Sequence, residues 1–156
     1  MPTWRESLSV FTQYYRSIED IRKSPPATED ELDIFVTEAE RKGYYISDDY
    51  LAFLRTTDGF DDFGLLIYAT HVREQPSAPL GFFDINDELR FEHPQRTFYG
   101  DTGDTMFVYD HPTSQFWVQD RASADLLDPF TTLGALFDHI FGEIAVQIQT
   151  SLAEKQ

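Results

Sequence analysis

Residues 46–68 read ISDDYLAFLRTTDGFDDFGLLIY, a segment that predicts a capped helix leading through an acidic turn into an apolar strand. Ser47 is the predicted helix cap, since its hydroxyl can accept a bond from a backbone N–H. Asp58 and Gly59 are predicted to end the helix, because glycine reaches the left-handed conformation that a helix stop often needs. The run 64–68 is apolar on both faces, which predicts a buried strand.

Helical spacing of apolar residues recurs on both sides of this segment. Thr28 and Glu31 form a predicted capping box, a hydroxyl followed three residues later by Glu, and the helix that they start is predicted to end at Gly43. Apolar residues at helical spacing in 130–148 predict a closing helix. A first helix over about 3–23 is predicted from its amphipathic stripe. This stripe consists of Trp4, Leu8, Phe11, Tyr15 and Ile18.

Short aromatic or branched runs between turn signals predict strands in the middle of the chain. Helices first, then strands, then a helix indicate the α+β class. We therefore expect a single domain over residues 1–156, with a largely antiparallel, curved sheet flanked by N-terminal helices and a C-terminal helix. The predicted strands are 65–68, 81–85, 97–99, 105–109 and 115–119.

The composition indicates a folded chain without cysteine. The 156 residues are 41% hydrophobic and 15% aromatic, which is enough material for a core. The absence of cysteine excludes disulfides, thiolate nucleophiles and cysteine-ligated zinc. No apolar run reaches the roughly 20 residues that span a bilayer, and the first residues lack a signal-peptide pattern, so we expect a cytoplasmic protein.

The strongest global signal is the formal net charge of −16. Residues 29–104 alone carry 18 acidic and six basic side chains. Such a surface repels nucleic acid and anionic lipid, because binding either of them requires positive charge. It attracts basic proteins and speeds their encounter, although solubility is the simpler reading of the same charge.

Carboxylates close to a histidine raise the alternative of catalysis. Asp101, Asp104, Asp110 and His111 lie within eleven positions and are types of residue that act as acid and base or bind a metal. Asp and Gly are also the preferred residues of tight turns, and no calcium-loop, zinc, phosphate-loop or serine-nucleophile motif is present. We therefore expect no catalytic residue, no metal and no cofactor.

The acids that exceed what turns and helix caps require are the predicted contacts for a protein partner. Crowded like charges cost stability unless solvent or a partner relieves the repulsion, and a solvated face is the alternative reading. The predicted partner-binding residues are Asp58, Asp61, Asp62, Asp84, Asp87, Glu88, Asp101 and Asp104.

In this order, the motifs resemble the SUKH superfamily and within it the YrhA-like group. The resemblance covers 28–145, a family-like core, and leaves 1–27 as an extra N-terminal helix. Its motifs stand here as TEDELD from Thr28, SDDYLAFL from Ser47, Asp58-Gly59, GLLIY from Gly64, FYGDTGDTMFVYD from Phe98, FWV from Phe116 and FTTLGALF from Phe130. The family often has Leu-Pro where Ile46-Ser47 stands here, and Ser is an equally sound cap.

The resemblance implies a non-enzymatic immunity protein that binds and neutralises a cognate bacterial toxin. A basic nuclease is one candidate toxin, and an acidic inhibitor would match its surface. A housekeeping scaffold or regulator without a toxin is the alternative, and a small metal-dependent hydrolase is a further one. The apolar closing helix could also support a homodimer.

Overall fold

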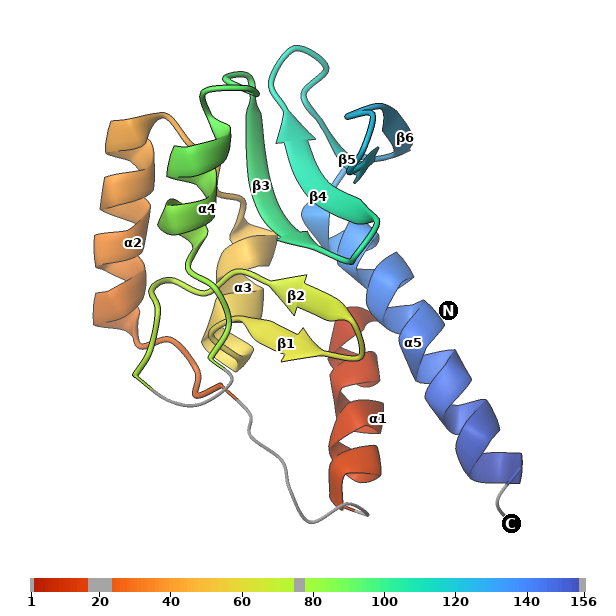
Figure 1. The fold of residues 1–156 in the computed structure, drawn as a ribbon. Coiled ribbons are helices and arrows are strands. Elements are labelled where there is room, and N and C mark those ends of the chain that lie inside the picture. The colour runs from red at the N-terminus through yellow and green to blue at the C-terminus, as the bar shows by residue number, and fades with distance from the viewer. Residues whose placement is uncertain (1, 17–23, 75–77, 155–156) are drawn as a thin grey trace. The chain divides into compact units, whose positions relative to one another are not determined.

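The computed structural model describes residues 2–16, 24–74 and 78–154 of the chain (Figure 1). The chain divides into two compact units, a helical unit formed by 1–22 with 133–156 and a sheet unit formed by 23–132. The elements are α1 (Trp4–Arg16), α2 (Glu29–Lys42), α3 (Asp48–Thr56), β1 (Phe60–Asp62), β2 (Leu65–Ile67), α4 (Phe82–Leu89), β3 (Arg96–Asp101), β4 (Thr105–Asp110), β5 (Gln115–Asp120), β6 (Leu126–Phe130) and α5 (Leu133–Glu154).

The helical unit consists of α1 packed against α5. The ring centroids of Phe11 and Phe141 lie 5.9 Å apart, and the backbone N–H of Trp4 donates to Asp138 Oδ1 over 2.7 Å. Trp4 and Phe11 are buried, as the amphipathic stripe predicted. The predicted helical residues 17–23, with Ile18, and the side chain of Tyr15 lie outside the described residues. No helix in the described ranges is both long and apolar enough to cross a bilayer.

The sheet unit contains six strands in the order β1-β2-β3-β4-β5-β6, and every neighbouring pair is antiparallel. The predicted α+β class and antiparallel sheet are therefore confirmed. The register shifts between Phe98 and Gly100 and again between Val118 and Gln119, and such bulges bend the strand that carries them. β1 and β6 are the two edges of this sheet.

Gly100 lies where β2 comes closest to β3. A Cβ added at this position would lie 2.3 Å from the carbonyl oxygen of Leu66, far inside van der Waals contact. Gly100 pairs with Ile67, so the lack of a side chain allows the β1–β2 hairpin to join the rest of the sheet.

Helices α2 and α3 start as their cap sequences predict. The N–H of Glu31 donates to Thr28 Oγ1 and the N–H of Thr28 donates to Glu31 Oε1, which confirms the capping box, and Gly43 ends α2 with a φ of 81°. Ser47 accepts the N–H of Tyr50 at the start of α3. α3 ends at Thr56, two residues before the predicted stop.

One predicted element was wrong, and two strands of the structure were not predicted. The residues 81–85 were predicted as a strand, but α4 starts at Phe82, because Asn86 lies inward one turn later and its amide bonds the backbone of Phe82 and Phe98. The edge strands β1 and β6 were missed, because both are short and carry polar residues or proline.

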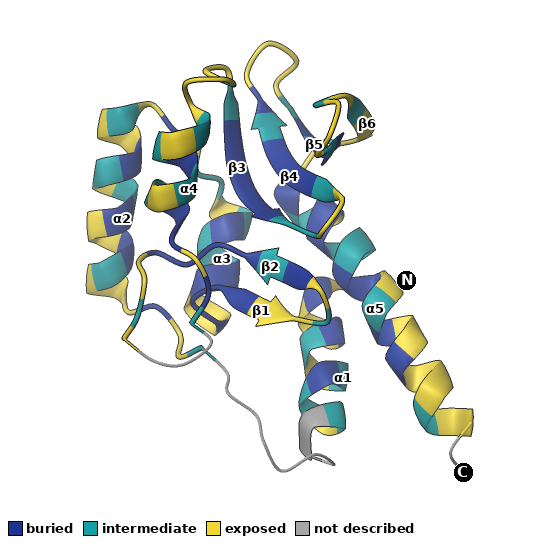
Figure 2. Ribbon diagram, viewed as in Figure 1, coloured by how far each residue is buried: buried dark blue, intermediate teal, exposed yellow. Residues whose placement is uncertain are grey.

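Figure 2 shows where buried residues lie along the ribbon of the sheet unit, and aromatic side chains form much of this buried core. The ring centroids of Phe35 and Phe82 lie 5.1 Å apart, as do those of Tyr50 and Tyr99. These four rings come from α2, α4, α3 and β3, so their packing fixes three helices and a strand relative to one another. Burial raises the pKa of Tyr50 and Tyr99 well above the ordinary value of tyrosine.

Candidate functional site

The eight predicted partner-binding acids occupy three places in the sheet unit. Asp58 lies in its interior, after α3. A second group lies on the β1–β2 hairpin and the β3–β4 turn, and a third lies on α4. The second group consists of Asp61, Asp62, Asp101 and Asp104, and the third consists of Asp84, Asp87 and Glu88.

Asp58 is not a surface residue, so it leaves the set of partner contacts. Its exposed fraction is 0%, and both carboxylate oxygens are bonded internally. Oδ1 accepts the backbone N–H of Thr70 over 2.7 Å, and Oδ2 accepts the Thr70 hydroxyl over 2.8 Å and Arg73 Nη2 over 2.7 Å. A buried carboxylate must find such partners or lose its charge, so Asp58 holds residues 70–73 in place.

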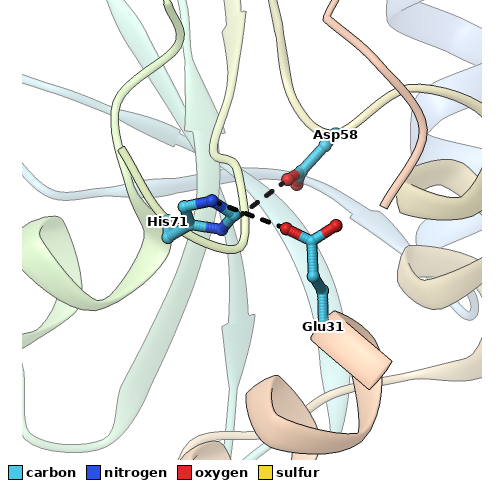
Figure 3. A group of neighbouring side chains, drawn as sticks. All are labelled: Glu31, Asp58 and His71. Carbon is cyan, nitrogen blue, oxygen red and sulfur yellow. Dashed lines mark ion pairs between the residues drawn. The ribbon is translucent and has the colours of Figure 1, made fainter. Parts of the chain in front are cut away.

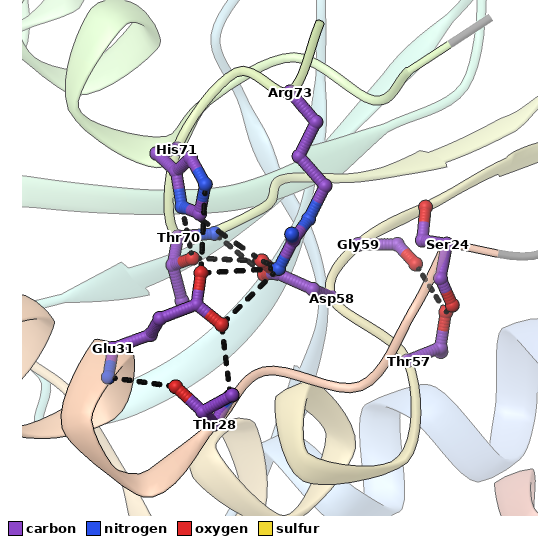
Figure 4. A network of polar contacts seen from close by, with 9 residues as sticks. All are labelled: Ser24, Thr28, Glu31, Thr57, Asp58, Gly59, Thr70, His71 and Arg73. Atoms are coloured by element: carbon purple, nitrogen blue, oxygen red, sulfur yellow. Dashed lines mark hydrogen bonds and ion pairs between the residues drawn. The ribbon is translucent and has the colours of Figure 1, made fainter. Parts of the chain in front are cut away.

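The same network reaches α2 through Glu31 (Figure 4). Arg73 Nη2 lies 3.2 Å from Glu31 Oε2, and His71 Nε2 lies 3.5 Å from the same oxygen. The N–H of Thr28, together with the charges of Arg73 and His71, holds the pKa of Glu31 below its ordinary value. The Thr70 hydroxyl donates to Asp58, so its 2.9 Å contact with His71 Nδ1 favours a proton on that nitrogen.

Glu31, Asp58 and His71 form a group of side chains with metal-ligand chemistry (Figure 3). One ligand atom from each lies within 4.8 Å of the others, and two carboxylates with an imidazole suit a divalent transition metal. However, the Arg73 guanidinium contacts both carboxylates and supplies the positive charge that a metal would bring. The group is thus explained as an internal ion network.

The acids of the hairpin have a different environment. Asp61 and Asp62 are exposed on the edge strand β1, as Figure 2 shows for this strand. Asp61 lies opposite Leu66, which lies opposite Asp101, so the two acids share one row across three strands. Partial burial and the negative charges of Asp62 and Asp101 raise the pKa of Asp61 above its ordinary value. In the described ranges no lysine or arginine forms an ion pair with Asp61.

Asp101 and Asp104 extend this acidic edge. Asp101 accepts the Tyr68 hydroxyl over 2.7 Å and lies 3.1 Å from Arg121 Nη2, while Asp104 is exposed on the following turn. We call Asp61, Asp62, Asp101 and Asp104 the hairpin acids. Arg121 offsets the charge of Asp101.

Among the three acids of α4, Asp87 forms an ion pair with a lysine. Asp87 accepts both Lys42 Nζ and the Tyr44 hydroxyl over 2.5 Å. Burial alone would raise the pKa of Asp87, but the bonds from Lys42 and Tyr44 outweigh it and the pKa lies below its ordinary value. Asp84 and Glu88 are exposed, four residues apart on the same helix face.

The acids and histidine that suggested a hydrolase lie at opposite ends of strand β4. Asp101 and Asp104 lie before β4, and Asp110 and His111 lie at its other end, so the six residues of this strand separate them by roughly 17 Å. Asp110 instead accepts the N–H and the hydroxyl of Thr113 and lies 3.5 Å from Arg96. The hydrolase hypothesis loses its proposed site.

An open groove lies along α2, next to the Glu31 network. Its volume is about 780 Å³, and its lining combines apolar rings and aliphatic groups with carboxylates. Ile34 projects from α2 with an exposed fraction of 72%. Phe83 of α4 also lines the groove, and its ring is tilted against that of Phe35 with the centroids 5.3 Å apart. The lining residues are Glu31, Asp33, Ile34, Phe35, Thr37, Glu38, Thr70, His71 and Phe83.

Sequence reasoning missed both the ion network and the groove. His71 and Arg73 lie 40 or more positions from Glu31, and only the exposed Ile34 between acids gave a local signal. Comparison with models of protein families and with curated proteins found no match.

Proposed function

We propose that this protein is a non-enzymatic immunity protein that binds a cognate bacterial toxin through its acidic surface and so blocks the toxin's active site. We place this activity in the cytoplasm and take the toxin to be basic, as a nuclease would be. The proposal keeps the hairpin acids and the exposed acids of α4 as contacts, and it excludes Asp58.

The observation that carries the proposal is the electrostatic state of Asp61. Asp61 adjoins Asp62 on β1 and shares a row of the sheet with Asp101, so the folded protein holds like charges together at a cost, in line with the raised pKa of Asp61. A lysine or arginine from a partner would relieve this cost, and the bound complex would gain what the free protein lacks. Tyr68 and the sheet hold Asp101 in place, so part of this anionic surface is rigid before binding.

An edge strand also carries charge for another reason. Acidic side chains on β1 keep a second sheet from pairing with its open edge, which protects against aggregation without any partner. The other edge supplies a matched control, because Asp128 on β6 and Asp125 just before it are both exposed and can be neutralised in the same number.

The test starts with co-expression and co-purification of the product of the adjacent gene, followed by a protection assay in cells that express it. Association is then measured against salt for D61N/D62N and for D125N/D128N. We expect the first pair to slow association about tenfold at low salt and to flatten the salt dependence, with a smaller change in the second pair. Equal effects, or none, would contradict a role for the hairpin acids.

A partner without toxicity would instead favour the scaffold alternative. In that case the complex forms but the protection assay shows no difference between cells with and without this protein.

A further inference from the structure

The sheet unit has two acidic regions, the hairpin acids and the groove along α2. The groove differs from the hairpin acids because it also offers apolar surface. The hairpin acids present carboxylates, whereas the groove presents Ile34, Phe35 and Phe83. Charged rim contacts mainly set the rate of association, while buried apolar anchors set the rate of dissociation. The groove is thus suited to a second task.

Two acids of the groove lining, Glu31 and Glu38, have cationic partners within the protein. Arg73 is held by Glu31 and Asp58. Lys42 Nζ lies 2.5 Å from Asp87 and 5.2 Å from the centroid of the Phe83 ring, and Arg41 pairs with Glu38. Glu31 and Glu38 are therefore offset by cations of the chain itself, and a basic occupant would face the other acids of α2 and α4.

The middle of the groove is apolar and open to solvent. The ring of Phe83 is fixed by Phe35 and by Phe82, each 5.3 Å away, so its exposed part is presented in one orientation. Ile34 has little to cover it, and covering such a side chain releases water from apolar surface. An apolar side chain of an incoming segment fits here.

The walls of the groove are acidic. α2 carries six acidic and two basic residues, with both basic ones in its last turn, and α4 carries three acidic and no basic residues. The segment that supplies the apolar side chain should therefore carry Arg or Lys beside it. From Glu31 to Glu38 the groove follows about 10 Å of helix, so the contact involves roughly two turns of a bound helix.

We infer that the groove along α2 binds a short amphipathic segment of a protein partner, with an apolar anchor on Ile34 and Phe83 and basic residues facing the acids of α2 and α4. The inference rests on the proposed function in taking this segment to belong to the same basic partner. The groove would set how long the complex lasts, and the hairpin acids how fast it forms.

The first test uses a defined probe and requires no knowledge of the partner. A helical peptide of about 14 residues, with one face of Leu and Arg beside it, is titrated into the ¹⁵N-labelled protein. We expect saturable shifts of the amides of Ile34, His71 and Phe83. A peptide with Ser in place of Leu should bind at least about tenfold more weakly, because it lacks the anchor.

Two substitutions make the test specific. I34S removes the exposed apolar group from the groove, and F91S removes one that is 86% exposed and lies outside the groove lining. We expect I34S to weaken binding of the Leu peptide about tenfold and F91S to leave it unchanged. Absence of binding, equal binding of the Ser peptide, or shifts confined to Asp61 and Asp62 would overturn the inference.

Two further measurements distinguish a partner segment in the groove from the proposed function alone and from a second copy of the chain. With the co-purified partner, I34S should accelerate dissociation and leave association unchanged; a partner that binds with no effect of I34S overturns the groove and leaves the proposed function standing. Sedimentation of the protein alone tests the other occupant, since a dimer that I34S dissociates would mean that a second copy fills the groove.

Discussion

Asp58 and Asp61 are three residues apart in the sequence and occupy opposite electrostatic environments. Asp58 is buried and receives the N–H and hydroxyl of Thr70 and the guanidinium of Arg73. Asp61 is exposed, has acidic neighbours and has a raised pKa. The carboxylates of this protein thus include two populations, one that is buried and bonded internally and one that is exposed to solvent.

The largest loss of stability is expected on substitution of Asp58. D58A removes the buried one of the two carboxylates that hold Arg73 and the acceptor of the Thr70 N–H and hydroxyl, so we expect the free energy of unfolding to fall by about 3 kcal/mol in urea denaturation. D61A is the matched control and should stay within about 0.5 kcal/mol of the unmodified protein. Similar losses in the two variants would remove the distinction between the two populations.

An intermediate loss of stability is expected at Lys42, which forms an ion pair with the half-buried Asp87. K42M removes the ammonium group from Asp87, so the pKa of Asp87 should rise, as an NMR titration would measure. The loss of stability at neutral pH should be at most about 1 kcal/mol, because both side chains remain partly exposed. R90M, which removes a more distant charge, is the control.

The pH dependence of this effect follows from the lowered pKa of Asp87. A lowered pKa in the folded state gives stability that is fully present above the unfolded value of about 3.9 and is lost as pH falls through the folded pKa. K42M should therefore lose less stability than the unmodified protein on acidification below about pH 4. An unchanged acid transition would mean that Lys42 does not hold the pKa of Asp87 down.

The smallest effect on stability is expected at Asp61, where substitution should stabilise the protein instead of destabilising it. Its raised pKa means that the charged form costs stability above the folded pKa, and that this cost disappears as pH falls below the unfolded value. D61N should stabilise the protein by no more than about 0.5 kcal/mol at neutral pH and by nothing in acid. A destabilised D61N at neutral pH would show that Asp61 belongs with Asp58.

Local sequence predicted those elements whose signals are local. The capping box at Thr28, the Ser47 cap and the strands at 105–109 and 115–119 needed only neighbouring residues. The helix at 82–89 could not be recognised in the same way. Asn is typical of turns, and its helical position here depends on side-chain hydrogen bonds from Asn86 to the backbone of Phe98 in β3, which is distant in the sequence.

The candidate site was predictable only as a set of acids. Crowding identified the hairpin and α4 acids, but nothing local distinguished Asp58 from Asp61, since the distinction depends on Arg73 fifteen positions later. The groove likewise depends on α2 and α4 meeting through Phe35 and Phe83, a contact between residues 48 positions apart.

The close approach at Gly100 has a consequence for how recognition could diversify. Since the β1–β2 hairpin is joined to the sheet through a contact that tolerates no side chain at Gly100, that position is fixed while the outward residues of β1 are not. New specificities could therefore arise by exchanging two or three residues at the hairpin without rebuilding the scaffold. A library randomised at Asp61 and Asp62 should keep its folded members, whereas one randomised at Gly100 should retain glycine.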